Sequence, residues 1–230
     1  MKLKNSFKHL TKFELCLWLF SLTAMMVSFL IPKEKDFLTL IASLIGVTAL
    51  IFIAKGLVLG QILTVVFAIF YGLVSFFFKY YGEMITYLCM TAPSAVLAII
   101  SWVKHPYKNS DEVKINKMTK KQVVFMIFLT ILATILFYFI LGAFDNRNLI
   151  VSTLSITTSF LASYLTFMRS PFYAIAYAVN DIVLIVLWVL ASIVNISYFP
   201  FVICFLLFLV NDIYGFINWK KMEKLQKENK

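Results

Sequence analysis

The 230-residue sequence is poor in charge: Asp, Glu, Lys and Arg make up only 14% of it, whereas 62% is apolar and 17% is aromatic. A soluble domain is typically about half apolar and about a quarter charged. This deficit, together with a mean hydropathy of +0.91, excludes a soluble protein, a disordered chain and a nucleic-acid-binding domain. The net charge of +10 would ordinarily suggest an anionic partner, but in a membrane protein it more often reflects topology.

Cysteine and histidine are also scarce, which bears on metal and redox chemistry. Cys16, Cys89 and Cys204 lie in apolar runs without a C-x-x-C spacing, which supports neither a disulfide framework nor a zinc site. His9 and His105 both lie in basic stretches, so the apolar segments hold no H-E-x-x-H helix. Because the spans also lack a nucleophile beside a base, we expect no metal, no cofactor and no enzymatic activity.

Apolar runs long enough to cross about 30 Å of hydrocarbon occupy nearly the whole chain. We expect eight spans, at residues 13–31, 37–54, 57–78, 84–103, 122–141, 149–168, 172–194 and 201–219. Thr119 and Gln122 have the spacing of a capping box, and Pro93 lies well inside a span, where we expect a kink. The first span follows a basic start, but it has no small-x-small cleavage site, which indicates a retained helix rather than a signal peptide.

The basic residues predict how these spans are oriented. With the amino terminus in the cytoplasm, 17 of the 21 Lys and Arg residues fall in cytoplasmic segments, and the outer loops hold Lys33, Lys35, Lys79 and Arg147. This bias follows the positive-inside rule. The sequence therefore predicts a multi-pass protein of the plasma membrane with both termini in the cytoplasm.

Two groups of three spans echo each other at an offset of 117 residues. Residues 100–104 align with 217–221, and the same shift brings Tyr71 onto Trp188. The unpaired span between the groups lets both run in the same direction, an arrangement of transporters that bind substrate at the repeat interface. We expect an all-α fold of 1+3+1+3 helices: a basic segment and extra helix at 1–36, repeats at 37–105 and 149–219, a loop and linker helix at 106–148, and a basic tail at 220–230.

Acidic residues at membrane depth are the leading functional candidates. Asp181 and Asp212 fall well inside spans, and each follows an asparagine, Asn180 or Asn211. A carboxylate in hydrocarbon costs roughly 2.5 to 3.5 kcal/mol on insertion scales, so both must face a cavity or a partner. The alternative is that these polar groups form interhelical hydrogen bonds, which contribute roughly 0.6 to 2 kcal/mol each.

Helical spacing extends these positions into two polar and aromatic stripes. Tyr173, Tyr177, Asn180 and Trp188 share one face, and Asn218 shares another with Asn211. Aromatic faces can stack on a flat ring, more strongly if it is cationic, while amides and carboxylates bind its hydroxyls. Gln61 and Tyr71 could line the opposite wall, with simple packing as the alternative for Tyr71.

The segments from Asn180 to Trp188 and from Asn211 to Trp219 closely resemble the PnuC-type nicotinamide riboside transporters. The resemblance extends from about Phe37 to the end of the chain, and the closing N-x-x-Y-G-x-x-x-W pattern, which adds Tyr214, is fairly specific. It implies a SWEET-like core, a homotrimer, and facilitated diffusion of a vitamin-like nucleoside that a cytosolic kinase then traps by phosphorylation. Nicotinamide riboside is the lead substrate.

One departure from the family pattern keeps other substrates open. Many members carry a W-x-x-W pair where this chain has Phe172, Tyr173 and Tyr177, so thiamine or another vitamin is the alternative substrate. A proton-coupled transporter that uses Asp181 or Asp212, and a non-transporting scaffold, are the alternative functions. The candidate substrate-binding residues are Tyr173, Tyr177, Asn180, Asp181, Trp188, Asn211, Asp212, Tyr214, Asn218, Gln61 and Tyr71.

Overall fold

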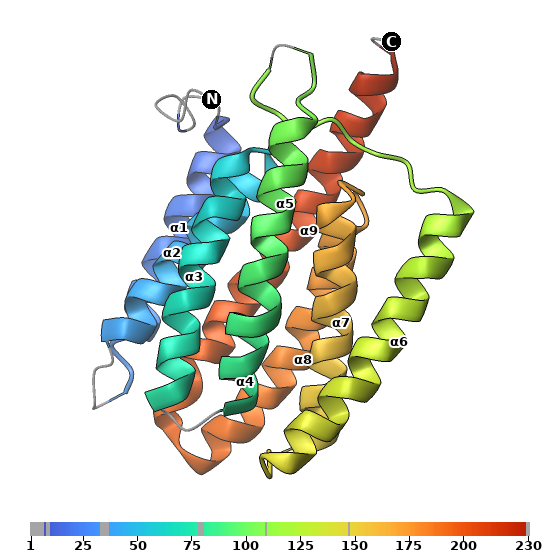
Figure 1. Ribbon diagram of the computed structural model, residues 1–230. Helices are drawn as coiled ribbons and strands as arrows, with labels where there is room; N and C mark the ends of the chain where they lie inside the picture. Colours follow the sequence, from blue (N-terminus) through green and yellow to red (C-terminus); the bar gives the residue numbers. More distant parts are fainter. Residues whose placement is uncertain are drawn as a thin grey trace.

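The computed structural model describes residues 7, 10–32, 37–77, 81–108, 110–146 and 148–228. Its helices are α1 (Lys12–Ser28), α2 (Phe37–Ala54), α3 (Val58–Phe77), α4 (Tyr81–Ile85), the π-helical turn η2 (Thr86–Thr91), α5 (Ala92–Lys104), α6 (Lys120–Ala143), α7 (Leu149–Phe167), α8 (Tyr173–Val194), the 3-10 turn η3 (Ile196–Tyr198) and α9 (Phe199–Glu228). The long helices form one bundle, and the start of α1 and the end of α9 lie at the same end of it (Figure 1). We call this end the terminus end and the opposite one the far end.

The bundle has the all-α, multi-pass architecture expected from the apolar runs. In the described part of the chain, seven helices are long and apolar enough to cross a membrane, with α4, η2 and α5 acting together as one span. Helix α1, at 17 residues, corresponds to the first expected span, and whether it crosses fully stays a prediction. Lys33, Lys35, Lys79 and Arg147, which were assigned to outer loops, lie outside the described residues.

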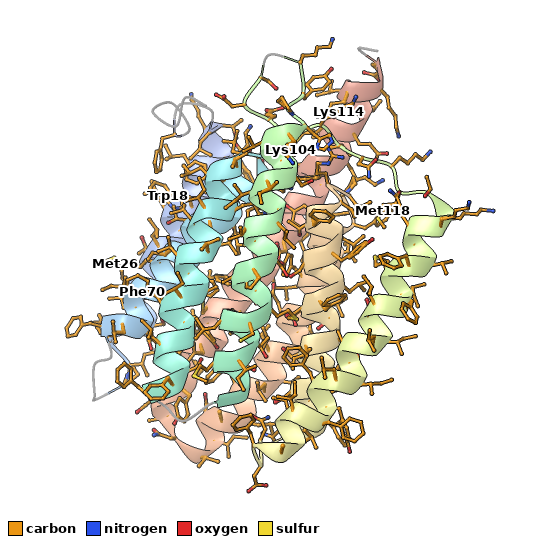
Figure 2. The ribbon with its side chains drawn as sticks, in the orientation of Figure 1. Trp18, Met26, Phe70, Lys104, Lys114 and Met118 are labelled. Atoms are coloured by element: carbon orange, nitrogen blue, oxygen red, sulfur yellow. The ribbon has the colours of Figure 1, made fainter. Side chains whose placement is uncertain are left out.

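Apolar side chains cover the sides of the bundle, whereas basic ones gather at the terminus end. Met26 is 57% exposed and Phe128 is 60% exposed, and Figure 2 shows Met26 pointing outward and Lys104 and Lys114 at the terminus end. Because an apolar flank this extensive would be unstable in water, it is suited to lipid. The protein is therefore a multi-pass membrane protein.

Two local features bear on the helix signals in the sequence. At the start of α6, the Gln122 N–H donates to Thr119 Oγ1, and Gln122 Oε1 accepts from the Thr119 N–H at 2.9 Å, which confirms the expected capping box. A kink is expected at Pro93; the structure has a π-helical turn, Thr86–Thr91, immediately before α5, in which Pro93 is the second residue. Proline has no N–H to donate to the preceding turn, so a change of helix type can accommodate it there.

Helix α9 continues to Glu228, past the expected end of the last span at residue 219. Glu223 accepts from Lys220 at 2.8 Å and from Lys227 at 2.7 Å, and pairs at this spacing stabilise a helix in water. The basic segment expected as a tail is therefore helical as far as residue 228.

The segment after α5 is tied to the terminus end of the bundle. The Val113 N–H donates to Gly56 O at 2.9 Å, and the Asn116 N–H donates to Arg169 O at 3.0 Å. Gln226 of α9 binds the same segment, since its Nε2 donates to Val113 O at 3.1 Å. The turns after α2 and α7 are thus held by one segment of chain.

Candidate functional site

A cavity lies in the middle of the bundle between α2, α3, η2, α7, α8 and α9. We call it the central cavity. Its polar lining comprises Gln61, Thr64, Tyr87, Thr91, Ser159, Ser163, Tyr173, Tyr177, Asn180, Asp181 and Asp212. Its volume of about 70 Å³ is below the roughly 300 to 1,000 Å³ of typical ligand sites. The cavity is therefore in a contracted form that must widen to admit a ring.

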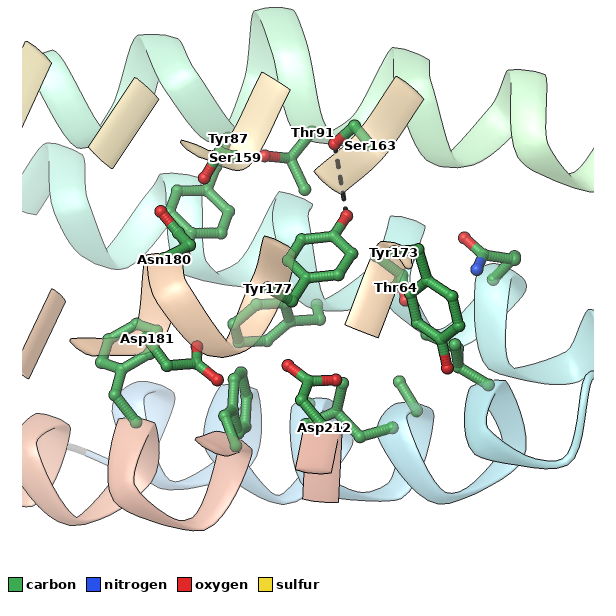
Figure 3. Close-up of a pocket in the computed structure, with 18 residues that line it drawn as sticks. Thr64, Tyr87, Thr91, Ser159, Ser163, Tyr173, Tyr177, Asn180, Asp181 and Asp212 are labelled. Carbon is green, nitrogen blue, oxygen red and sulfur yellow. Dashed lines mark hydrogen bonds between the residues drawn. The ribbon is translucent and has the colours of Figure 1, made fainter. Parts of the chain in front are cut away.

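Two carboxyl groups dominate the electrostatics of this cavity. Asp181 of α8 is 2% exposed and Asp212 of α9 is 3% exposed, and their carboxyl groups point toward one another (Figure 3). Two like charges this close repel strongly when they are buried. The pair is therefore suited to binding a cation or to sharing a proton.

Hydroxyl groups of α7 hold the polar face of α8 in place. Asn180 Oδ1 accepts a hydrogen bond from Thr158 at 2.8 Å and one from Ser155 at 3.4 Å. The Tyr177 hydroxyl and Ser163 Oγ lie 3.2 Å apart, as the dashed line in Figure 3 shows. These contacts orient an amide and a phenol at the cavity before any ligand arrives.

Three buried aromatic rings close the cavity toward the terminus end. The ring of Trp219 lies 4.7 Å from that of Tyr173, which lines the cavity, and 5.4 Å from that of Trp102. Each of the three side chains is at most 1% exposed. We call Trp102, Tyr173 and Trp219 the terminus-end layer.

The indoles of this layer bind the backbone of two other helices. Trp102 Nε1 of α5 donates to Thr166 O near the end of α7 at 3.0 Å. Trp219 Nε1 of α9 donates to Ile53 O near the end of α2 at 2.9 Å. The donors are 117 residues apart in sequence, and the acceptors are 113 apart.

A second pair of hydrogen bonds, from the residues next to these in sequence, shows the same separations between donors and between acceptors. Ser101 Oγ donates to Phe167 O at 2.8 Å, and Asn218 Nδ2 donates to Ala54 O at 2.8 Å. Again the donors are 117 residues apart and the acceptors 113. The last helix of each expected repeat thus binds the end of the first helix of the other, and we call these four bonds the latch.

A second group of rings closes the cavity toward the far end. Trp188 stacks on Phe201 with centroids 4.2 Å apart and an angle of 22°, while Tyr71 lies 4.2 Å from Tyr87 and 6.4 Å from Trp188. Tyr87 lines the central cavity, whereas Trp188 lines a different cavity at the far end. We call Tyr71, Tyr87, Trp188 and Phe201 the far-end layer. The central cavity is therefore closed at both ends.

The structure brings six of the eleven candidate residues to the central cavity. They are Gln61, Tyr173, Tyr177, Asn180, Asp181 and Asp212. Tyr71 and Trp188 lie in the far-end layer instead, and Asn218 belongs to the latch.

The two remaining candidates, Asn211 and Tyr214, face helix α1. Asn211 Nδ2 donates to Ser21 Oγ at 3.3 Å, and the Tyr214 hydroxyl donates to Glu14 Oε1 at 2.5 Å. Glu14 also pairs with Lys55 at 3.4 Å. These two side chains therefore attach the first helix to the bundle and do not reach the cavity.

The cavity also has polar lining residues that the sequence analysis did not single out. Thr64, Thr91, Ser159 and Ser163 supply hydroxyl groups from three elements. Single hydroxyls in apolar runs are common because they can bond to the preceding turn of their own helix, so they carry no signal of a site.

Comparison with known proteins gives consistent matches along nearly the whole chain. A family model described as nicotinamide mononucleotide transporter matches residues 36–221. The chain is 24% identical over 219 residues to the nicotinamide riboside transporter PnuC of Neisseria mucosa. The aligned region covers 93% of this chain and 83% of that protein. It is 24% identical over 197 residues to the nicotinamide riboside transporter PnuC of Haemophilus influenzae, with 84% of each covered. The crystal structure of the vitamin B3 transporter PnuC matches with a TM-score of 0.82 at 25% identity, over 94% of both chains.

Proposed function

Because the chain belongs to the nicotinamide mononucleotide transporter family, we propose that it carries nicotinamide riboside across the membrane by facilitated diffusion. The resemblance noted at the two Asn-Asp segments is thereby confirmed. The structural observation that supports a cationic substrate is the buried pair Asp181 and Asp212 in the central cavity. A pyridinium ring with a ribose is a cation that carries hydroxyl groups, and this pair can neutralise the charge.

The other cavity side chains complement the rest of this ligand. Tyr173 and Tyr177 offer ring faces to a flat cation, and Asn180 offers an amide to a hydroxyl or a carboxamide. Thiamine, which also contains a cationic ring, is the alternative substrate of the same chemistry. We propose that the two aromatic layers open in turn, so that the cavity meets one side of the membrane at a time.

The latch supports the proposed internal repeat. Two parallel groups, residues 37–105 and 149–219, would be related by an axis along the membrane normal, with residues 106–148 as loop and linker helix. Matching donors then bind matching acceptors across the axis, and the matching side chains Trp102 and Trp219 contact each other on it. Residues 1–36 would add a helix outside this core, and residues 220–230 a basic extension.

The remaining parts of the proposal concern the surroundings of the protein. The terminus end would face the cytoplasm of a plasma-membrane protein, because the positive charges gather there. Transport would be downhill, a cytosolic kinase would retain the substrate by phosphorylation, and the protein itself would catalyse no reaction. The family resemblance supports assembly as a homotrimer.

The facing carboxyl groups of Asp181 and Asp212 (Figure 3) favour one alternative mechanism, in which the pair releases a proton when substrate binds. Proteoliposomes that contain the purified protein test both mechanisms with labelled nicotinamide riboside and thiamine. A facilitator should bring nicotinamide riboside to equal concentrations on both sides, with or without an imposed pH difference. The double variant Asp181→Asn and Asp212→Asn should weaken uptake. Asp145→Asn, an exposed far-end carboxylate, is the control.

Two outcomes of this experiment would contradict the proposal. Several-fold uphill accumulation that depends on the proton gradient, and that Asp181→Asn abolishes, would establish proton coupling. Uptake of thiamine with no uptake of nicotinamide riboside would contradict the proposed identity of the substrate.

A further inference from the structure

A second cavity opens at the far end of the bundle, beyond the far-end layer. We call it the far-end cavity. Its volume is about 210 Å³, which is larger than that of the contracted central cavity. Its polar and aromatic lining comprises Glu83, Asn146, Asn148, Ser152, Trp188, Asn195 and Tyr198. Trp188 is therefore a wall of this cavity and a part of the layer that separates it from the central one.

The far-end cavity contains a buried carboxylate. Glu83 is 7% exposed, and within the residues that the structure describes its side chain has neither a hydrogen bond nor an ion pair. An unpaired charge that is removed from water is costly. A carboxylate at such a position, lining a cavity, is suited to a cation that comes from outside the fold.

The neighbouring walls are held in place without a ligand. Asn146 Nδ2 donates to Ser152 Oγ at 2.9 Å, and a methyl group on Gly82 would lie 2.5 Å from Asn146 Oδ1. The lack of a side chain at Gly82 therefore lets α4 and Asn146 approach closely. This brings the Asn146 amide next to the helix that carries Glu83. Stacking on Phe201 fixes the plane of the Trp188 ring.

We propose that the far-end cavity is an entry site, in which Glu83 binds the cationic ring of the substrate before the far-end layer opens. The proposal rests on the proposed function, because it takes the far end as the outer face and a pyridinium nucleoside as the ligand. A cavity lined by a carboxylate, an indole and amide groups suits a flat cation with hydrogen-bonding substituents. Capture next to the layer raises the local concentration of substrate at the point where the path opens.

Initial uptake rates in proteoliposomes test the entry site. A cleft of low dielectric that is lined by negative charge can raise the association rate of a cation about tenfold or more at low ionic strength, and Glu83 is the acidic residue that lines this cavity. We expect Glu83→Gln to raise the KM for nicotinamide riboside about tenfold at low salt and to leave the maximal rate nearly unchanged. The increase should shrink toward twofold in high salt. Glu83→Asp should restore most of the affinity, and Asp145→Asn, at the same end of the bundle, should have no effect.

A neutral substrate separates charge from shape. The reduced, uncharged form of nicotinamide riboside should show the same KM in the wild-type protein and in Glu83→Gln. An unchanged KM for the cation in Glu83→Gln, or an equal rise for both forms, would overturn the entry site while wild-type transport still supported the proposed function. If the wild-type protein transported neither form, calorimetric binding of 1-methylnicotinamide would decide the matter. Weaker binding in Glu83→Gln than in Asp145→Asn would support the site, and equal binding would refute it.

Discussion

The latch makes a quantitative prediction about how the terminus end opens. Under the proposed mechanism, its four hydrogen bonds exist only while this end is closed. Asn218→Ala removes the bond from α9 to Ala54 O, and Ser101→Ala removes the matching bond from α5 to Phe167 O. Both variants keep Trp102 and Trp219, so the terminus-end layer itself stays intact. Each should shift the equilibrium toward the state that is open at the terminus end.

The size of the shift follows from the strength of one neutral hydrogen bond. Such a bond contributes about 1 kcal/mol net, and since about 1.4 kcal/mol is a factor of ten, each variant should raise the open population about fivefold. The bonds of Ser101 and Asn218 share no partner. We therefore expect the double variant to multiply the two effects to about 25-fold.

Thiol labelling at the central cavity measures this population. In a background without Cys16, Cys89 and Cys204, a cysteine placed at Thr64, which lines the cavity, should react slowly with a small reagent added at the terminus end. Labelling should be about fivefold faster in each single variant. Thr134→Ala, which removes a 2.8 Å contact between α6 and α7, is the control and should leave the rate unchanged. Unaltered labelling in the double variant, with the protein folded, would refute the role of the latch.

Two further predictions concern the asparagines and the orientation. Asn180→Ala should weaken substrate binding by roughly 1 to 3 kcal/mol. Because Asn211 faces α1, Asn211→Ala should lower the melting temperature and leave substrate affinity unchanged. Calorimetry and thermal melts distinguish the two variants, and equal losses of affinity would contradict the assignment. A cysteine at Asn148 should react with an impermeant reagent in intact cells, and one at Ser110 only after permeabilisation. Labelling of Ser110 in intact cells would reverse the orientation.

The fold follows closely from the apolar runs, because crossing a membrane imposes a length and a composition. The run at 37–54 matches α2, and the other spans differ mainly at their ends. Helix α9 shows why the ends are harder to predict. Apolarity marks where a helix lies in lipid, but beyond Trp219 the helix continues in water, where pairs such as Lys220 with Glu223 stabilise it.

The candidate site could be predicted in part, for a physical reason that differs from residue to residue. Asp181 and Asp212 stand out because a charge in an apolar run needs a compensating environment. Asn211 was grouped with them, yet it lies next to Asp212 in sequence and points about 100° away around the helix. That angle directs Asn211 to α1 and Asp212 to the cavity. The sequence does not show on which side of α9 the helix α1 packs.

The central cavity combines a repeated scaffold with unlike side chains. Under the proposed repeat, Thr64 on α3 corresponds to Asp181 on α8, and Leu50 on α2 corresponds to Ser163 on α7; all four line the cavity. In both pairs the second half supplies the more polar group, whereas Thr91 in the first half corresponds to Phe208 in the second. The carboxyl groups of Asp181 and Asp212 both belong to the second half. A nucleoside with a cationic ring at one end and a neutral sugar at the other needs such a difference. The symmetry therefore serves the opening and closing of the bundle, while the departures from it orient the ligand.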